Sequence, residues 1–548
     1  MKNNYFYFLL LLPLLMQSQN IQWEKSYGGK HADYLFDVQP TADYGFILAG
    51  SSLSDKSGTK SENNQGDLDY WVWKMDENGK PDWQKSLGGS GFDLLKSIKG
   101  TKDGGFILAG TSNSNTGFHK KDSCKGNTDF WVFKLNAKGD EQWQRTIGGT
   151  GQEELLCAFQ TTDGGYMLGG SSSSDATKTT TSKNALTTSK KEMTNKSTNS
   201  RGNMDYWIVK LNPQGEVQWQ QTYGGKYADV LRSMEQTQDG GYILGGYSNS
   251  PQSGDKTETS IGIGDYWVVK IDNSGTIEWQ RTYGGNGDNQ LYVIHQTKDE
   301  GYLIGGNTNS TNSLTSKGGT VSNGTDFWLL KIDAKGNEDW SQTYDYGKVD
   351  ILTSLVENKD HTFLIGGYAQ NGATSEGGLA LKKQQAKGIN DYIALKIDAK
   401  GQEIWTQSVG SSGEDILRKL IETRDGGYLL AGTSNAASSL DKNSTIGSND
   451  FWVVKLQDQG KSSLVERALI EVFPNPVATF TNVIIGYEYS SGTATVVDLS
   501  GRTLQQFPIT SRTVPIDLSK APEGIYIVNI NTNVQNDGVK VIKGITKN

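Results

Sequence analysis

A repeated unit constrains the fold of this chain more than any other feature of its sequence. A tryptophan followed within a few residues by Gly-Gly, or a close variant, recurs at Trp23, Trp83, Trp143, Trp219, Trp279, Trp340 and Trp405. A second signature, Asp-Tyr/Phe-Trp, begins at Asp69, Asp129, Asp205, Asp265, Asp326 and Asp450, and Asp391-Tyr392-Ile393 is a degenerate seventh copy. Self-similarity of this kind predicts a repeat architecture, such as a propeller or a solenoid, rather than one large globular core.

Each unit predicts four antiparallel strands. The first two are joined by an Asp-Gly turn, as at Asp239-Gly240, which needs the positive φ that glycine supplies. The third strand opens with the Asp-aromatic signature, and the fourth carries the recurring tryptophan. The spacing varies only in inserts between the second and third strands, at residues 51–68, 171–204, 307–325 and 368–390. Without its insert each of these four repeats keeps a constant core of 42 residues, the size of a propeller blade.

The two ends of the repeat region are complementary. The chain opens on a fourth-strand segment at residues 21–27, and the last repeat stops after its third strand at residues 451–456. Pairing these ends in one blade closes the ring and leaves no open edge. A β-helix solenoid is the alternative, but it gives no reason for complementary ends. We therefore predict an all-β protein: a seven-bladed β-propeller of four-stranded blades, with its ends closing in one blade, followed by a small β-sandwich.

The recurring tryptophan resembles a known packing motif. The segment from Asp333 through Gly336 to Trp340 is similar to the docking motif of quinoprotein dehydrogenase-type propellers, in which the spacing from Asp to Trp is one residue longer. In that family the tryptophans pack between neighbouring blades, and the resemblance implies no quinone cofactor here. The large area of the rings favours an interblade core over a ligand-stacking surface.

The N-terminus is typical of a secretory signal. A lysine precedes an apolar run from Tyr5 to Met16, and polar residues follow, so we expect a signal peptide at residues 1–18, cleaved near Ser18. The run is too short to span a bilayer and no later segment approaches the necessary length, so no transmembrane segment is expected. The first cysteine is Cys124, which disfavours a lipid anchor. The propeller is then expected over residues 19–460.

A different pattern begins after a predicted linker at residues 461–470. Short alternating strands fill residues 471–548 and predict the β-sandwich. This stretch resembles the type A C-terminal sorting domain of the type IX secretion system of Bacteroidetes over its whole length. The residues that carry the resemblance are Pro474, Asn475 and Pro476, the turn from Asp498 to Gly501, Gly524 and Tyr526, and Lys540 and Lys543 near the end. The resemblance implies export to the outer-membrane surface or beyond, with the type IX machinery as a partner.

Composition narrows the remaining choices. The net charge of -8 gives no attraction to a phosphate backbone, so nucleic acid is not an expected partner. Cys124 and Cys157 are interpreted as unpaired thiols, because a large repeat core needs no disulfide, although a bridge between them stays open. The sequence contains no common catalytic motif, and no cofactor is expected. The histidines occupy four different repeat positions, His31, His119, His295 and His361, without metal-binding spacing.

One acidic position recurs at the start of the first strand of each unit. It is filled by Asp33, Asp93, Glu153, Asp229, Asp350 and Asp415, and Asn289 interrupts the series. A carboxylate near a turn usually accepts backbone N–H groups. The alternative is a ligand or cation site, for which Ca²⁺ is the candidate if several oxygens converge. A lysine five residues after the strand-opening Asp also recurs, and we expect it to be structural; it is found at Lys74, Lys134, Lys210, Lys270, Lys331, Lys396 and Lys455.

Three classes of function are compatible with this sequence. A secreted or cell-surface, non-enzymatic binding or adhesion protein for a glycan or a surface protein is favoured, because the residues that depart from the repeat fall mostly in the inserts. A polysaccharide-active enzyme, a hydrolase or lyase, is the main alternative, and a structural exoprotein is the third. The inserts, rich in Ser, Thr, Gly and Lys as at residues 171–203, share a face with the acidic positions. We expect a ligand to bind on that face, although solvated linkers have the same composition.

Overall fold

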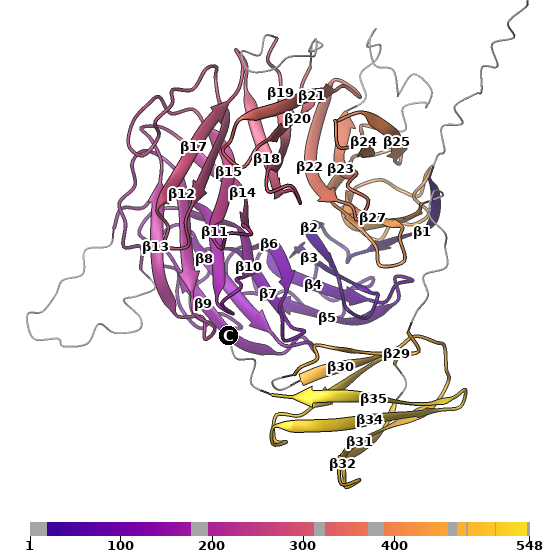
Figure 1. The fold of residues 1–548 in the computed structure, drawn as a ribbon. Coiled ribbons are helices and arrows are strands. Elements are labelled where there is room, and N and C mark those ends of the chain that lie inside the picture. The colour runs from indigo at the N-terminus through magenta and orange to yellow at the C-terminus, as the bar shows by residue number, and fades with distance from the viewer. Residues whose placement is uncertain are drawn as a thin grey trace, which may run out of the picture.

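The computed structural model describes residues 19–176, 195–311, 324–370, 388–458, 468–477, 480–509 and 511–544. The regular elements in these ranges are all β-strands, and the ranges include no helix that could span a bilayer. The predicted signal peptide at residues 1–18 lies outside the described residues, as do residues 459–467, which include most of the predicted linker. Figure 1 shows the strands gathered into a ring of sheets with a smaller unit beside it.

Seven four-stranded antiparallel sheets form the ring. Blade 1 contains β2 (Asp33–Pro40), β3 (Phe46–Ser52), β4 (Asp69–Met75) and β5 (Pro81–Leu87). Blade 2 contains β6 (Asp93–Gly100), β7 (Phe106–Ser112), β8 (Asp129–Leu135) and β9 (Glu141–Ile147). Blade 3 contains β10 (Glu153–Gln160), β11 (Tyr166–Ser172), β12 (Asp205–Leu211) and β13 (Val217–Tyr223). Blade 4 contains β14 (Asp229–Gln236), β15 (Tyr242–Ser248), β16 (Asp265–Ile271) and β17 (Ile277–Tyr283).

The remaining blades complete the ring. Blade 5 contains β18 (Asn289–Gln296), β19 (Tyr302–Thr308), β20 (Asp326–Ile332) and β21 (Glu338–Tyr344). Blade 6 contains β22 (Val349–Glu357), β23 (Phe363–Gln370), β24 (Asn390–Ile397) and β25 (Glu403–Val409). Blade 7 contains β26 (Asp415–Glu422), β27 (Tyr428–Ser434) and β28 (Asp450–Gln457), and its fourth strand is β1 (Asn20–Tyr27). Every blade thus presents its tight turns on one face of the ring, the turn face, and its insert on the other, the insert face.

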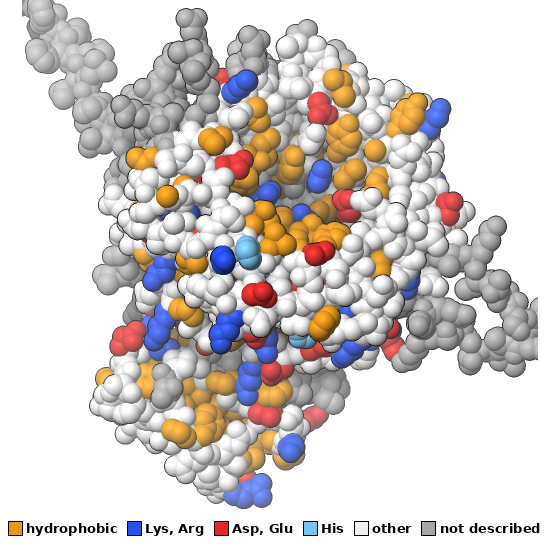
Figure 2. Space-filling model, turned by 180° about the vertical axis from the view of Figure 1, so that it is seen from behind, with side chains coloured by type: hydrophobic (Ala, Val, Ile, Leu, Met, Phe, Trp, Pro, Cys, Tyr) orange, Lys and Arg blue, Asp and Glu red, His pale blue; other side chains and the backbone are white. Residues whose placement is uncertain are grey.

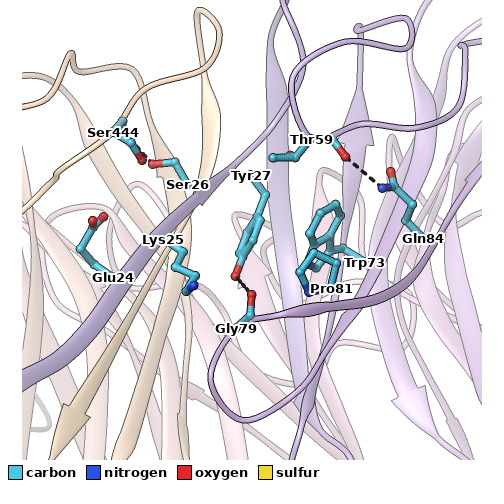
Figure 3. Close-up of a pocket in the computed structure, with 10 residues that line it drawn as sticks. All are labelled: Glu24, Lys25, Ser26, Tyr27, Thr59, Trp73, Gly79, Pro81, Gln84 and Ser444. Atoms are coloured by element: carbon cyan, nitrogen blue, oxygen red, sulfur yellow. Dashed lines mark hydrogen bonds between the residues drawn. The ribbon is translucent and has the colours of Figure 1, made fainter. Parts of the chain in front are cut away.

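The ends of the repeat region close the ring in blade 7, as predicted. β1 pairs antiparallel with β28, with Asn20 opposite Gln457 and Tyr27 opposite Phe451. Figure 3 shows the groove of about 480 Å³ at this closure, where the Tyr27 hydroxyl donates to the Gly79 carbonyl of blade 1 at 2.6 Å. The same tyrosine-to-glycine bond recurs at other interfaces, for example from Tyr283 to Gly336 at 2.6 Å. The groove is therefore one of a series of joints between blades.

A ring of aromatic side chains holds the blades together. The first aromatic residue of Asp-Tyr/Phe-Trp in one blade contacts the tryptophan of the next, with ring centroids 4.6 to 5.0 Å apart. The pairs are Tyr70–Trp131, Phe130–Trp207, Tyr206–Trp267, Tyr266–Trp328, Tyr392–Trp452 and Phe451–Trp71. Because these tryptophans are buried, the pairs supply a large part of each interblade core.

The tryptophans of the other motif are half-buried and also lie between blades. A Cβ added to Gly139 of blade 2 would stand 2.9 Å from the Trp83 ring of blade 1, and Gly215 bears the same relation to Trp143. Gly139 has a φ of 81°, so glycine is required there by the turn as well as by the ring. This packing confirms the interblade role predicted for these tryptophans.

The C-terminal unit is a two-sheet sandwich. One sheet contains β29 (Ile470–Phe473), β30 (Phe480–Ile485) and β33 (Thr513–Asp517). The other contains β32 (Thr503–Ile509), β31 (Gly492–Asp498), β34 (Gly524–Thr532) and β35 (Asn536–Lys543). Val483, Val496 and Val528 belong to a core of its own, separate from those of the blades.

The sandwich contacts the turn face of the propeller. Arg512 Nη1 lies 2.8 Å from Glu77 Oε1, and the Thr513 hydroxyl donates to Asp43 Oδ2 at 2.9 Å. Arg424 of blade 7 pairs with Glu471 at 3.0 Å. A cavity of about 930 Å³ lies along this contact. All of these contacts are on the face opposite the inserts.

Candidate functional site

The six predicted acidic residues lie at the insert end of the innermost strands, and all are 0% exposed. Each accepts a backbone N–H from the segment that crosses over from the preceding blade; the amide of Gly89, for example, donates to Asp93 Oδ2 at 2.7 Å. The same bonds are made to Asp33, Glu153, Asp229, Asp350 and Asp415. Serine hydroxyls add to them, as from Ser114 to Asp93 at 3.0 Å. The carboxylates therefore fix the crossing segments from inside the fold.

Each of these positions lies beside the strand-opening Asp of the preceding blade. The amide of Asp93 donates to the carbonyl of Leu68, which directly precedes Asp69, at 2.5 Å. Oδ1 of Asp69 and Oδ1 of Asp93 are both buried and accept no hydrogen bond from the described residues. Burial and, to a smaller extent, the nearby Asp93 charge raise the pKa of Asp69 to about 7, although the hydrogen bond from the Gln65 amide lowers it. A buried carboxylate pair therefore stands at this junction.

Asn289 shows what satisfies such a pair. It occupies the acidic position of blade 5, and its Nδ2 donates to Asp265 Oδ1 and to the Gly264 carbonyl, both at 3.1 Å. Its Oδ1 accepts from the hydroxyls of Thr308 and Ser310, as the carboxylates do elsewhere. One amide thus replaces one carboxylate and supplies the missing donor.

A buried lysine in each of five inserts was not predicted from the sequence. Lys60, Lys120, Lys196, Lys256 and Lys442 are each at most 2% exposed. Lys60 Nζ donates to the Ser54 carbonyl at 2.8 Å and to Asn64 Oδ1 at 3.0 Å. Burial lowers the pKa of Lys60, while the charges of Asp33 and Asp69 oppose that shift. The sequence does contain a pattern that could have predicted these lysines, because in four repeats the lysine stands eight residues after the serine that ends the second strand.

The recurring lysines of the third strands, by contrast, are structural as expected. They pair with the Asp of the turn between the first and second strands, on the turn face, at 2.8 to 3.0 Å in five blades: Lys74–Asp43, Lys134–Asp103, Lys210–Asp163, Lys270–Asp239 and Lys331–Asp299. Lys455 and Asp425 make the same pair. Cys124 and Cys157 are both free thiols.

The junction of blades 5 and 6 departs from the repeat. Ile393 replaces the tryptophan of the aromatic ring, and Tyr346 fills that space, 6% exposed and 5.5 Å from the Phe327 ring. The preceding residue, Asp345, stands where six repeats have glycine, and a Cβ added to any of those glycines would clash with the strand-opening Asp. Carboxylate oxygens of Asp326, Asp345 and Asp350 consequently lie within 4.8 Å of one another. Among the described residues this is the one such group that could hold a metal ion.

The insert face exposes apolar side chains. Seven large hydrophobic residues of the inserts and crossing segments are exposed: Leu53, Phe118, Tyr227, Ile261, Ile263, Ile389 and Leu440. Phe118 and Leu440 are 68% and 62% exposed and adopt φ values of 51° and 55°. Gly58 and Gly254 hold the equivalent turn position in two other inserts, with φ values of 56° and 57°. Bulky residues therefore occupy a left-handed position that glycine would fill without strain.

The predicted sorting residues link the two ends of the sandwich. Asn475 Nδ2 donates to the Lys540 carbonyl at 2.9 Å, and its Oδ1 accepts from the Ile542 amide at 2.9 Å. Asn475, Pro476 and Lys540 are exposed. Tyr526 is buried in the sandwich core, with its hydroxyl bonded to the Pro522 carbonyl at 2.6 Å.

The neighbours of these residues complete the motif. The carbonyl of Pro474 accepts from the Thr481 hydroxyl at 2.6 Å, and Gly524 begins β34. The Lys543 ammonium donates to the carbonyls of Leu518 and Ser519. The motif thus combines an exposed edge with buried anchors.

Comparison with known proteins identifies this sandwich. Residues 471–544 match the family described as secretion system C-terminal sorting domain. A comparison with curated proteins gave no match.

Several solved structures are similar to the chain. PorZ, a surface component of the type-IX secretion system of Porphyromonas gingivalis, is 9% identical over 96% of this chain and 86% of its own, with a TM-score of 0.24. A Synechocystis apocarotenoid oxygenase variant is 12% identical over 81% and 95%, with a TM-score of 0.35. A glucose dehydrogenase is 11% identical over 80% and 100%, with a TM-score of 0.31. Residues 471–544 are a secretion system C-terminal sorting domain, attached to a seven-bladed β-propeller.

Proposed function

We propose that this is a protein exported through the type IX secretion system that acts at the cell surface or outside the cell as a non-enzymatic binding or adhesion protein. Its ligand is a glycan or a surface protein, and it binds on the insert face. The observation that carries this proposal is the set of exposed apolar side chains in the inserts and crossing segments. Such residues, gathered on loops of a rigid scaffold, are typical of interaction surfaces.

Phe118 and Leu440 are the best candidates for contact residues. A left-handed backbone costs a bulky residue about 1 kcal/mol or more, and glycine removes that cost. The fold itself does not need these side chains, because Gly58 and Gly254 make the same turn. Because backbone strain is retained at Phe118 and Leu440 although their side chains are exposed, a role for these side chains in recognition is supported.

The experiment compares the full-length secreted protein with the double variant Phe118→Gly, Leu440→Gly on an array of neutral and acidic oligosaccharides. The variant keeps the buried insert lysines, which a replacement of whole inserts would remove. We expect it to fold with equal or higher stability and to bind at least about tenfold more weakly, the loss of two apolar anchors. Ile404→Ala is the control, because Ile404 is 50% exposed on β25, next to the turn face. Full binding by the double variant would show that the ligand does not bind on the insert face.

For the acidic positions we propose a structural role, with a Ca²⁺ site at Asp326, Asp345 and Asp350. Asp350 is 0% exposed, and its Oδ1 accepts no hydrogen bond from the described residues although it faces two other carboxylates. Oxygen-only ligands suit Ca²⁺. Calorimetric titration of the full chain should then show one Ca²⁺ that is lost in Asp345→Gly, which restores the residue of the other repeats. Asp441→Gly, an acidic residue of another insert, is the control.

A polysaccharide-active enzyme is the second candidate, and one cluster supports it. His295 Nδ1 lies 3.2 Å from Glu235 Oε1, and its Nε2 lies 3.7 Å from Glu357 Oε2. His295 and Glu235 are not repeated at their position in the other blades, so unique polar residues occur on the innermost strands as well as in the inserts. Reducing-end release from a panel of polysaccharides, compared with Glu235→Gln, tests this candidate.

A further inference from the structure

A β-bulge re-aims one side chain of every innermost strand. Neighbouring innermost strands, β2, β6, β10, β14, β18, β22 and β26, contact one another around the ring. In each of them the pairing with the second strand skips one residue: Phe36, Lys96, Leu156, Arg232, Tyr292, Thr353 and Arg418. The residue before each bulge is 0% exposed, whereas the bulged residue is partly exposed. Figure 2 shows the hollow at the centre of the ring, with basic side chains on its wall.

Three of the bulged residues are cations, and Arg418 and Arg232 lie close enough to Lys96 for their charges to act on it. Lys96 Nζ lies 3.9 Å from the centroid of the Phe36 ring, and the Arg418 guanidinium lies 5.4 Å from the same centroid. The Arg232 guanidinium lies 5.5 Å from the Tyr292 ring. Burial, followed by the positive charge of Arg418 and, to a smaller extent, of Arg232, lowers the pKa of Lys96 to about 8. Aromatic rings from neighbouring blades thus hold the cations in place.

These cations have no acidic partner within ion-pair distance among the described residues. Nε of Arg232 and Nε of Arg418 are buried and make no hydrogen bond there. The nearby carboxylate that acts on Lys96 is Glu154, whose Oε1 already accepts from Gln152 at 2.6 Å. On the turn-face side, burial and then the positive charge of Lys99 lower the pKa of Lys419, and the charges of Asp37 and Glu235 oppose that shift. At the level of the bulges, the wall of the hollow therefore carries three cations, in a chain of net charge -8.

The fold does not require charge at this position. Leucine, phenylalanine, tyrosine and threonine fill the same bulge in the other four blades. Three like charges held together without counterions destabilise the folded state, so structure alone does not account for them. A concave, partly desolvated site with guanidinium forks on its wall attracts and orients oxyanions.

We propose that the central hollow is a binding site for an oxyanion, the carboxylate, sulfate or phosphate group of a free anion or of an acidic sugar, held by Lys96, Arg232 and Arg418. The site is separate from the insert face and does not depend on the ligand proposed there. Its two arginines supply planar pairs of N–H donors, and the lysine supplies a third positive charge.

Calorimetric titration of the full-length protein with sulfate, phosphate, digalacturonate and neutral digalactose tests the site. Saturable binding of the anions, with none of digalactose, is expected. Arg232→Gln and Arg418→Gln should each weaken that binding about tenfold, the worth of a charge-assisted pair. Arg281→Gln is the matched control, since Arg281 lies on the outer strand of blade 4, 3.8 Å from Glu258. Tighter binding of digalacturonate than of sulfate identifies a sugar ligand, and the reverse order identifies a free anion.

A pH series provides a second readout. Lys96 loses its charge as the pH rises through about 8, so affinity should fall between pH 7 and pH 9, and Lys96→Gln should remove that fall. If a glutamine variant fails to fold, leucine replaces it, because Leu156 occupies the same bulge. The proposal is overturned if none of the anions binds, or if folded variants at Arg232 and Arg418 bind as the native protein does.

Discussion

At the scale of single residues, the blade junctions bring carboxylates together where water is excluded. Hydrogen bonds to one oxygen of the carboxylate and the positive charge of the insert lysines nearby offset part of the cost of burying these groups. The other oxygens of Asp69 and Asp93 accept no hydrogen bond from the described residues, and an ionised group in that condition opposes folding. Asn289 shows that one substitution at this position satisfies both partners.

The variant Asp93→Asn should therefore stabilise the protein at neutral pH. The folded-state pKa of Asp69 is raised to about 7, so the folded chain binds a proton that the unfolded chain releases, and native stability falls as the pH rises from about 4 to 7. An amide at position 93 donates to Asp69 and favours its ionised form. We expect the advantage of the variant to grow from near zero at pH 5 to about 1–2 kcal/mol at pH 8, measured by urea unfolding.

The reverse substitution is the control. Asn289→Asp removes the amide that donates to Asp265, and it should destabilise the protein at pH 8 more than at pH 5. Opposite signs for the two variants identify the junction as the cause. Equal stability of Asp93→Asn and the native protein at every pH would show that the carboxylate pair is already neutralised.

At the scale of elements, β1 is the strand on which the ring depends. It supplies the outer edge of blade 7 and reaches blade 1 through Tyr27. Its residues lie far in the sequence from those they contact, as when Trp452 Nε1 donates to Glu24 Oε2 at 2.8 Å across 428 positions.

Deletion of residues 20–27 should lower the free energy of unfolding by several kcal/mol, because it removes buried Tyr27 and opens the ring. The measurement is thermal unfolding of the full chain with and without this segment. Tyr27→Phe removes only the bond to Gly79 and should cost about 1 kcal/mol, which separates the hydrogen bond from the closure. A truncated protein that melts with the native one would refute closure by β1.

The elements that could be predicted from the sequence are those with strict local chemistry. Asp239-Gly240 gives the hairpin because the turn needs positive φ, and Gly240 has a φ of 86°. The bulge at Arg232 could not be predicted, because it breaks the register without changing the spacing of the turns. The role of Tyr346 could not be predicted either, because it compensates for the loss of tryptophan at Ile393, which is distant in sequence. The acidic positions could be identified from the sequence, but their burial could not, because it depends on loops from two blades.

At the scale of the whole molecule, the sorting domain is a separate folding unit placed on the turn face. Its hydrophobic core is its own, and it contacts the propeller through polar pairs such as Arg512 with Glu77. Such an interface contributes little to the stability of either part.

Deletion of residues 471–548 should leave a folded propeller that stays in the periplasm of the native host. Cell fractionation locates the protein, and thermal unfolding shows that the melting temperature changes little. Arg512→Ala, which removes the contact with Glu77 alone, should be exported normally because the sorting motif is intact. Surface display of the deletion variant would contradict the assignment.

The seam between β1 and β28 also sets an order of events during synthesis. A ribosome delivers β1 first and β28 after six blades have emerged, so the ring stays open until residue 457 is available. Closing so long a loop is slow, and the unpaired β1 is a surface for misassembly until then. The sorting domain begins shortly afterwards, at residue 471. A chain interrupted before residue 457 therefore lacks the sorting domain as well, so that domain is present only on chains that already possess every blade.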